Sequence, residues 1–107
     1  MIVKNDSVAY DIMAPGLKRK IIATGGKMMA VEVHLKNGAI AAVHTHPHEQ
    51  IGYILKGSLE IEIDGKKNII KAGDSFYASP YTAHGAIALE DTIALDVFTP
   101  QRQDFLR

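Results

Sequence analysis

The chain contains no cysteine, so it has neither disulfide bonds nor thiolate ligands for a metal ion. Any metal ion that it binds must be held by nitrogen and oxygen atoms. Its residues also carry no excess charge, because 12 lysines and arginines balance 12 aspartates and glutamates. Without a basic stripe or a charged tail, the sequence argues against nucleic acid or a membrane surface as a partner and favours a small molecule.

Long hydrophobic runs are missing as well. No apolar stretch approaches the length of a membrane span, and the first residues lack the apolar segment of a signal peptide. We therefore expect a cytoplasmic protein. The 107 residues suffice for one hydrophobic core, so we expect a single domain over residues 1–107.

Helical stripes are not found either, and short β-type runs separated by turn signals take their place. Residues 17–24 and 27–35 flank Gly25-Gly26, and Asp64-Gly65, a strong hairpin signal, joins residues 59–63 to residues 66–71. Further turn signals recur at a spacing of about 8 to 12 residues, which is typical of a β-sandwich or β-barrel. The pattern predicts one all-β domain.

Three histidines form the clearest candidate site. His44 and His46 are two residues apart in an apolar run, so on a strand both side chains would project from the same face. His84 comes much later and can join them only if the sheet curls into a barrel. Because neutral imidazoles are good ligands for divalent metals, the spacing predicts a metal site and a barrel together.

Two further histidines are weaker candidates. His34 shares a strand face with Glu32, opposite an apolar face, and we interpret it as a structural residue. His48 is again two residues beyond His46, so a continuous strand would place it on the same face as His44 and His46, but Pro47 interrupts the strand. We expect His48 to line the pocket or the surface rather than to bind a metal.

The region around the histidines resembles the first sequence motif of the cupin superfamily, small β-barrels that bind a metal ion in the barrel interior. Gly38, His44, His46 and Gly57 match this motif, and Gln50 stands where its glutamate is usual. The resemblance implies a single-domain cupin barrel, also described as a double-stranded β-helix or jelly roll. It also implies one divalent metal ion, for which nickel, zinc, manganese, iron and cobalt all remain open.

The second cupin motif is matched from Gly73 to His84. Ser79 replaces its usual proline, Tyr81 its usual glycine and Ala88 its terminal asparagine, so the local turn geometry departs from the family's pattern. The metal-binding histidine of the motif is kept. The ligand set implied by the two motifs is His44, His46, Gln50 and His84.

A more specific resemblance covers nearly the whole chain. The runs H-T-H-P-H-E-Q (44–50), Y-I-L-K-G-S-L-E-I-E-I-D-G (53–65) and especially L-D-V-F-T-P-Q-R-Q-D-F-L (95–106) are similar to the pectin-degradation cupins known as KdgF. This resemblance implies an enzyme that converts 4,5-unsaturated uronates, the monosaccharides left by polysaccharide lyases, to a linear 5-keto-4-deoxyuronate. The expected partner is thus a small anionic sugar, and the cupin resemblance implies a homodimer, for which we expect the strands around Ile21-Ile22 to be exposed.

The last predicted strand, residues 92–98, has two distinct faces. Its apolar residues at 93, 95 and 97 share one face, whereas Asp96 and Phe98 lie on the other. From this pattern alone, the preferred interpretation is that Asp96 and Arg102 pair with each other or with lysines at the barrel rim. The resemblance instead implies catalytic roles: Asp96 as general acid or base, Phe98 packed on the sugar, and Arg102 holding its carboxylate together with the metal.

The ligand set favours one kind of metal chemistry. Three imidazoles and an amide bring no negative charge unless Glu49 turns inward, which favours Lewis-acid chemistry over redox cycling. We further expect His48, Gln50 and Tyr53 to donate or accept hydrogen bonds around the metal and its ligands. Two alternatives stay open: a cupin that binds a sugar acid or other small molecule without turnover, and, less favoured, a metal-dependent dioxygenase.

Overall fold

Ten β-strands make up most of residues 1–106, which are the residues that the computed structural model describes. Only two short 3-10 turns accompany them in this range, and it contains no helix long and apolar enough to cross a membrane. The all-β prediction is therefore confirmed. The elements are η1 (Asn5–Ser7), β1 (Asp11–Ala14), β2 (Leu17–Gly25), β3 (Met28–Leu35), β4 (Ile40–His44), β5 (Glu49–Lys56), β6 (Ser58–Ile63), β7 (Lys66–Lys71), β8 (Ser75–Ala78), β9 (His84–Ala88), β10 (Thr92–Thr99) and η2 (Gln103–Leu106).

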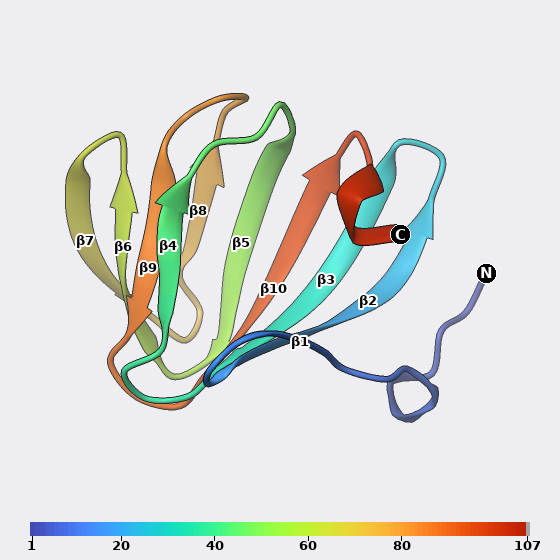
Figure 1. Ribbon diagram of the computed structural model, residues 1–107, viewed down its shortest axis with the longest axis horizontal. Coiled ribbons are helices and arrows are strands. Elements are labelled where there is room, and N and C mark those ends of the chain that lie inside the picture. The colour runs from blue at the N-terminus through green and yellow to red at the C-terminus, as the bar shows by residue number, and fades with distance from the viewer. Residues whose placement is uncertain (107) are drawn as a thin grey trace.

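The strands form two antiparallel sheets that face each other as the walls of a barrel (Figure 1). One has six strands in the order β1-β2-β3-β10-β5-β8, and the other has four in the order β4-β9-β6-β7. In Figure 1 the four-stranded sheet lies at the left, and the C-terminal turn lies near the upper ends of β3 and β10. The predicted hairpins are present, since β2 pairs with β3 and β6 with β7. The short edge strand β1 is not among the predicted strands.

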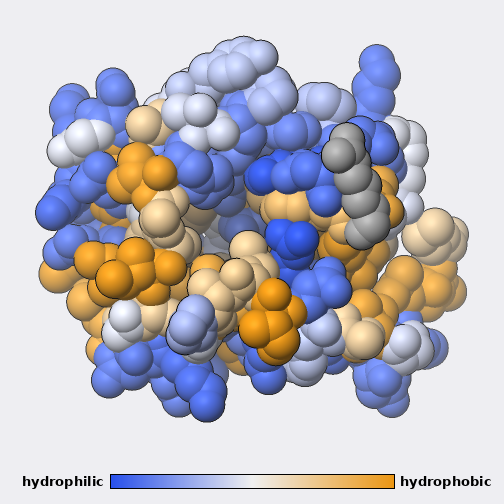
Figure 2. Space-filling model, viewed as in Figure 1, coloured by the Kyte–Doolittle hydropathy of each residue, from blue (hydrophilic) through white to orange (hydrophobic). Residues whose placement is uncertain are grey.

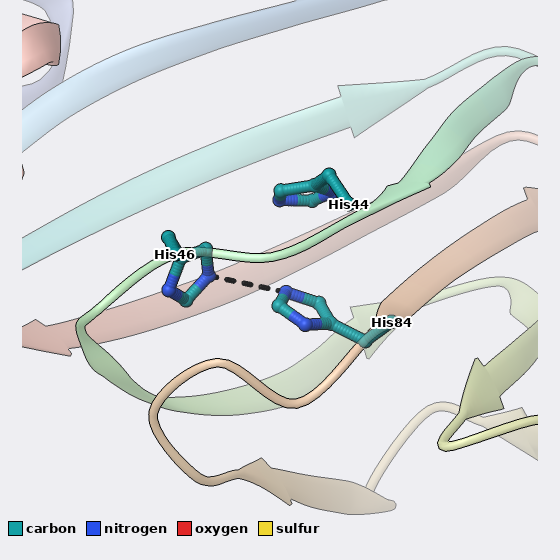
Figure 3. A group of neighbouring side chains, drawn as sticks. All are labelled: His44, His46 and His84. Atoms are coloured by element: carbon teal, nitrogen blue, oxygen red, sulfur yellow. Dashed lines mark hydrogen bonds between the residues drawn. The ribbon is translucent and has the colours of Figure 1, made fainter.

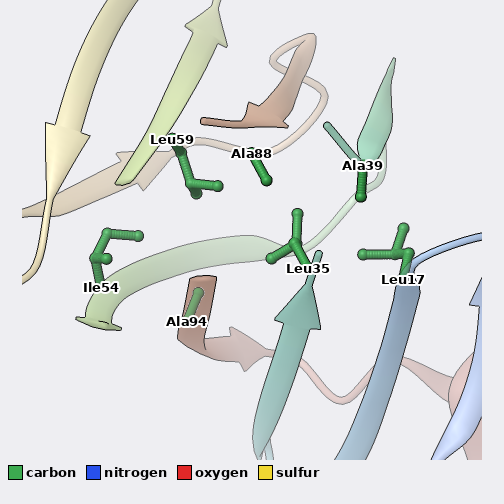
Figure 4. Close-up of a cluster of buried hydrophobic side chains, with 7 residues drawn as sticks. All are labelled: Leu17, Leu35, Ala39, Ile54, Leu59, Ala88 and Ala94. Carbon is green, nitrogen blue, oxygen red and sulfur yellow. The ribbon is translucent and has the colours of Figure 1, made fainter. Parts of the chain in front are cut away.

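Apolar side chains fill one end of the space between the sheets (Figure 4). Ile54 and Ala94 come from the six-stranded sheet and meet Leu59 and Ala88 from the other. These residues alternate with outward-facing ones along each strand, which is why the period-2 pattern of the sequence identifies them. The full cluster consists of Leu17, Leu35, Ala39, Ile54, Leu59, Ala88 and Ala94.

The inner face of the six-stranded sheet becomes polar toward the other end. Cα partners across β3, β10 and β5 place Val33 beside Ala94 and Ile54 in one row, and the next row contains Asp96 opposite Gly52. The residues that could bind a ligand therefore lie beyond the apolar cluster, at one end of the barrel.

The outer surfaces differ from the sequence-based expectation for a dimer contact. Ile21 does not lie on the surface but packs against the buried cluster of Met29, Val31 and Phe98. Exposed apolar residues lie instead on the outer faces of β5 and β8, where they are Ile51, Tyr53, Leu55 and Tyr77. Ile40, Val43 and Ile69 of the four-stranded sheet are exposed as well, and Figure 2 shows hydrophobic residues at the left of the molecule, the side on which this sheet lies in the same view.

Candidate active site

His44, His46 and His84 point toward one another at the polar end of the barrel (Figure 3). One ring nitrogen of each lies within 4.8 Å of the others, and the Nε2 atoms of His46 and His84 are 3.1 Å apart. His46 and His84 are only 5% and 4% exposed, whereas His44 lies at the open mouth. Burial lowers the pKa of His46 to about 4 and also lowers the pKa of His84, so both rings are neutral at pH 7.

Backbone carbonyl groups fix which nitrogen of each ring carries the proton. The Nδ1 atom of His44 lies 2.9 Å from the carbonyl oxygen of Ala42. The Nδ1 atom of His46 lies 3.0 Å from the carbonyl oxygen of His48, and that of His84 lies 2.8 Å from the carbonyl oxygen of Thr82. Because a carbonyl oxygen can only accept, each Nδ1 donates a hydrogen, and each Nε2 keeps a free lone pair. Lone pairs thus converge on the centre of the cluster.

Gln50 adds a fourth acceptor from β5. Its Oε1 lies 3.1 Å from Nε2 of His46 and 3.1 Å from Nε2 of His84. The Gln50 amide also acts on Asp96, since it lowers the pKa of that carboxyl group against the effect of burial. A convergence of neutral nitrogen and oxygen acceptors without a donor among them suits a divalent cation, so these residues fit the metal ion that the sequence predicts.

The position of His44 depends on a β-bulge in β4. Ala41 pairs with Ala86 and His44 with His84, so three steps along β4 match two steps along β9. The extra residue reverses the alternation and turns His44 inward beside His84. Gly85 makes room for this bulge, because a Cβ atom there would lie 2.8 Å from the oxygen of Ala41 and 2.8 Å from the nitrogen of Val43.

The prediction that His44 and His46 project from a single strand is wrong. β4 ends at His44, and His46 lies in the connection to β5, before Pro47. Backbone curvature in this connection, rather than strand alternation, brings the His46 ring to the other two. The two histidines still meet, but for a reason that spacing on one strand does not capture.

Asp96 lies in the wall of the same cavity, on the inner face of β10. Burial raises its pKa to about 6, although the Gln50 amide and the positive charge of Arg102 act in the opposite direction. Phe98, two residues on, is buried, and its ring lies edge-to-face with that of His46 at a centroid distance of 5.7 Å. Asp96 and Phe98 therefore share the inward face, as their parity predicts.

Arg102 follows β10 and reaches back into the cavity. It does not form the ion pair with Asp96 that the strand pattern alone favoured. Its Nε and Nη2 atoms donate to the carboxylate of Asp104 at 3.1 and 2.9 Å, and its Cζ lies 5.1 Å from the centre of the Phe98 ring. Arg102 thus brings a positive charge to the mouth of the site, while its Nε and Nη2 groups are engaged by Asp104.

Several other predicted residues lie away from the centre. Glu49 points outward and accepts a hydrogen bond from the Tyr77 hydroxyl at 2.7 Å, so it does not turn toward the histidines. Tyr53 lies on the outer face of the sheet, so the expectation that it makes hydrogen bonds around the metal and its ligands is wrong. His48 stacks near His46 without joining the convergent group. His34 lies beside Glu32 on the outer face, as expected of a structural residue.

The cavity lining includes residues that were not among the predicted site residues, notably Arg19 from β2, Phe76 from β8 and Phe105 from the C-terminal turn. The sequence does carry a signal for Arg19, because it shares its parity with Leu17 and Ile21, and a charged residue on an otherwise apolar strand face is unusual. No comparable pattern marks Phe105, whose position depends on how the chain turns back after β10.

Comparison with known proteins agrees with this arrangement. Residues 31–98 match the family model described as a cupin domain. The pectin degradation protein KdgF of Dickeya dadantii (strain 3937) is 40% identical over 104 residues, which cover 95% of this chain and 94% of that protein.

Two solved structures extend the comparison. The structure of KdgF from Halomonas sp. superimposes with a TM-score of 0.94 at 39% identity, covering 98% of this chain and 97% of that one. An RmlC-like cupin from Shewanella frigidimarina NCIMB 400 superimposes with a TM-score of 0.93 at 33% identity, covering 97% and 94% of the two chains. The chain therefore belongs to the cupin superfamily and, within it, to the KdgF family.

Proposed function

We propose that this protein is a metal-dependent enzyme that converts 4,5-unsaturated uronates to linear 5-keto-4-deoxyuronate. The observation that carries the proposal is the convergence of the three histidines beside a cavity that Asp96 and Arg102 also line. Membership of the KdgF family supports a uronate as the substrate, because the named relative is a pectin degradation protein. The cavity sets these few polar groups among mostly apolar side chains, which is the usual composition of a small-molecule site.

The metal ion would be held by His44, His46, Gln50 and His84, whose acceptor atoms converge without a donor among them. When bound, a divalent ion supplies Lewis acidity for oxygen atoms of the ligand. The second coordination layer is already in place, because three carbonyl groups hold the imidazoles in the required tautomer. Manganese, iron, cobalt, nickel and zinc all accept such ligands.

The reaction rearranges atoms within the sugar only. The anomeric hydroxyl loses its proton, the bond between C1 and the ring oxygen breaks to leave an aldehyde, and C4 gains a proton as the oxygen on C5 becomes a ketone. Asp96 would take the first proton and deliver the second, which a carboxyl group in the cavity wall can do without a co-reactant. Arg102 would hold anionic oxygens of the uronate, and Phe98 would pack on the sugar and exclude water.

An ultraviolet assay tests this function. Purified protein, loaded in turn with each of the five metals, should abolish the absorbance of the conjugated double bond in unsaturated uronates derived from pectin or alginate. Loss of absorbance together with formation of the linear keto acid supports the enzyme. Binding without any loss of absorbance would favour the non-catalytic sugar-acid binding protein, and oxygen uptake with iron would favour the dioxygenase.

We also propose that the protein is a homodimer. The outer face of the six-stranded sheet of this small protein carries exposed apolar side chains: Ile51 is 53% exposed, Tyr53 43% and Tyr77 51%. A second copy would cover such a face. Sedimentation at micromolar concentration should find a dimer, and a monomer alone would contradict the proposal.

A further inference from the structure

A second arginine lines the cavity and has no role in the function proposed above. Arg19 lies on β2, paired with Val33 of β3, and its side chain belongs to the inner face of the six-stranded sheet. It borders the same cavity as Asp96 and Arg102. A long cationic side chain on the inner face of a small barrel is costly unless an anionic or polar group compensates it.

The hydrogen-bonding state of Arg19 differs from that of Arg102. The side chain of Arg19 is 16% exposed, and its buried Nε atom has no hydrogen-bond partner. The carboxylate of Asp11 is 3.8 Å from that atom, which is too far for a hydrogen bond. Arg102, in contrast, donates from both Nε and Nη2 to Asp104. The Nε and Nη2 groups of Arg102 are therefore engaged by Asp104, whereas Arg19 has only the longer ion pair with Asp11 and no hydrogen bond at Nε.

Phe105 holds the Arg19 guanidinium in place. The Cζ atom of Arg19 lies 3.5 Å from the centre of the Phe105 ring, and the Cζ atom of Arg102 lies 4.1 Å from the same ring. Stacking on an aromatic face fixes the plane of a guanidinium and leaves its N–H groups, which lie in that plane, available to a ligand. The C-terminal turn thus orients two cationic groups at one mouth.

We propose that Arg19 binds the carboxylate of the ligand, alongside Arg102, and makes the cavity selective for sugar acids over neutral sugars. The proposal rests on the proposed function, because it names the residue that would recognise the anionic end of the uronate. A carboxylate matches the fork of a guanidinium and would accept hydrogen bonds from the Nη groups of this cavity-lining arginine. Arg19 and Arg102 would then share the anionic end of the uronate.

The competing explanation is that Arg19 only secures the C-terminal turn through Phe105. Lys18 offers a matched control, since it is the neighbouring cation on β2, has the opposite parity, and stacks on Tyr10 with its Nζ 3.9 Å from the ring centre. Loss of Lys18 removes the same charge from the same strand but leaves the cavity intact.

The test compares Arg19→Met, Arg19→Lys and Lys18→Met in steady-state turnover of an unsaturated uronate, with melting curves for each protein. Arg19→Met should raise KM by about 10- to 100-fold with kcat changed by less than about threefold, since a charge-assisted contact is lost. Arg19→Lys keeps the charge but not the fork and should raise KM by about 5- to 10-fold. Lys18→Met should keep the wild-type KM.

Competitive inhibition separates binding of the carboxylate from support of the turn. Galacturonate and galactose share one ring and differ in the carboxylate, so the wild-type protein should prefer galacturonate and Arg19→Met should lose most of this preference. A folded Arg19→Met protein with the wild-type KM and preference would overturn the proposal. If Arg19→Met does not fold, Arg19→Lys decides, and a wild-type KM in that variant overturns the proposal equally.

Failure of the proposed function gives a different result. In that case the wild-type protein would consume no unsaturated uronate with any of the metals, and the role of Arg19 would be tested by NMR titration with galacturonate and galactose. A preference for galacturonate that Arg19→Met abolishes would support the carboxylate site even without catalysis. Equal binding of both sugars by the wild-type protein would refute it.

Discussion

At the scale of single residues, the three imidazoles are prepared for a metal by their backbone neighbours. Each Nδ1 is committed to a carbonyl oxygen, so no ring can turn its protonated nitrogen inward without losing a hydrogen bond. Burial of His46 and His84 disfavours their charged forms and keeps them available as ligands. The site is preorganised by contacts that do not touch the metal.

Replacement of His84 should remove the metal. The His84→Ala protein should contain well under one metal ion per chain by elemental analysis, because a ligand at the buried centre of the site is lost. His34→Ala is the matched control, since His34 lies on the outer face beside Glu32 and should not affect metal content. Full metal content in a His44→Ala, His84→Ala double variant would disprove the assignment.

Asp96 separates catalysis from binding. Asp96→Asn keeps the shape of the side chain but cannot exchange a proton, so turnover should fall by about 10²- to 10⁴-fold. The fold, the metal content and most of the affinity for the uronate should remain. Stopped assays of chromophore loss, with parallel binding measurements, check this expectation. Turnover at the wild-type rate would rule out Asp96 as the acid or base.

The limits of sequence reasoning are also seen at this scale. Parity along residues 92–98 was sufficient to place Asp96 and Phe98 on one face, and the structure turns that face toward the cavity. Tyr53 could not be excluded in the same way, because its strand is apolar on both faces and the sequence does not say which face is inside. The outward orientation of Glu49 likewise depends on its hydrogen-bond partner, Tyr77, which is distant in the sequence.

At the scale of elements, the bulge in β4 decides where His44 points. A regular strand would alternate Ala41 inward and His44 outward, and only the extra residue opposite β9 restores His44 to the inside. The spacing of the histidines and the family motif both identified His44 without any knowledge of the bulge. Strand alternation alone could not say that His44 points inward, because a bulge is set by pairing with another strand rather than by local sequence.

Gly85 should be indispensable to this bulge. A methyl group at Gly85 would collide with the backbone of Ala41 and Val43, so Gly85→Ala should destabilise the fold by about 1–3 kcal/mol and reduce metal content. Gly25→Ala is the control, because a Cβ atom at Gly25 meets nothing within 4 Å. Its effect should stay within about 0.5 kcal/mol. Equal stability and metal content in both variants would show that the bulge tolerates a side chain.

The C-terminal turn should respond to acid through Asp104. The hydrogen bonds from Arg102 lower the pKa of Asp104 below its ordinary 3.8, so the carboxylate is favoured in the folded state. Its stabilising contribution is fully present above the ordinary pKa and is lost as the pH falls through the lowered one. The melting temperature of wild-type protein should exceed that of Asp104→Asn at pH 6, and the gap should close in strong acid. A gap that is independent of pH would contradict this coupling.

At the scale of the whole molecule, the site joins the two sheets. His44 and His84 belong to the four-stranded sheet, Gln50 belongs to the six-stranded sheet, and His46 lies in the chain that connects them. The apolar cluster holds the sheets together at the opposite end of the barrel. A metal ion would therefore join the two sheets at the end of the barrel opposite this cluster.

Removal of the metal should lower the stability of the entire barrel. A ligand that binds only the folded state at 100 times its dissociation constant contributes about 2.7 kcal/mol, which for a domain of this size corresponds to a shift in melting temperature of about 10 °C or more. Chelator should lower the melting temperature of metal-loaded protein by this order, and added metal should restore it in proportion to the logarithm of its concentration. His84→Ala should melt at one temperature with or without chelator, since its site is incomplete. A wild-type melting temperature that ignores both chelator and metal would mean that the convergent acceptors do not hold an ion across the two sheets.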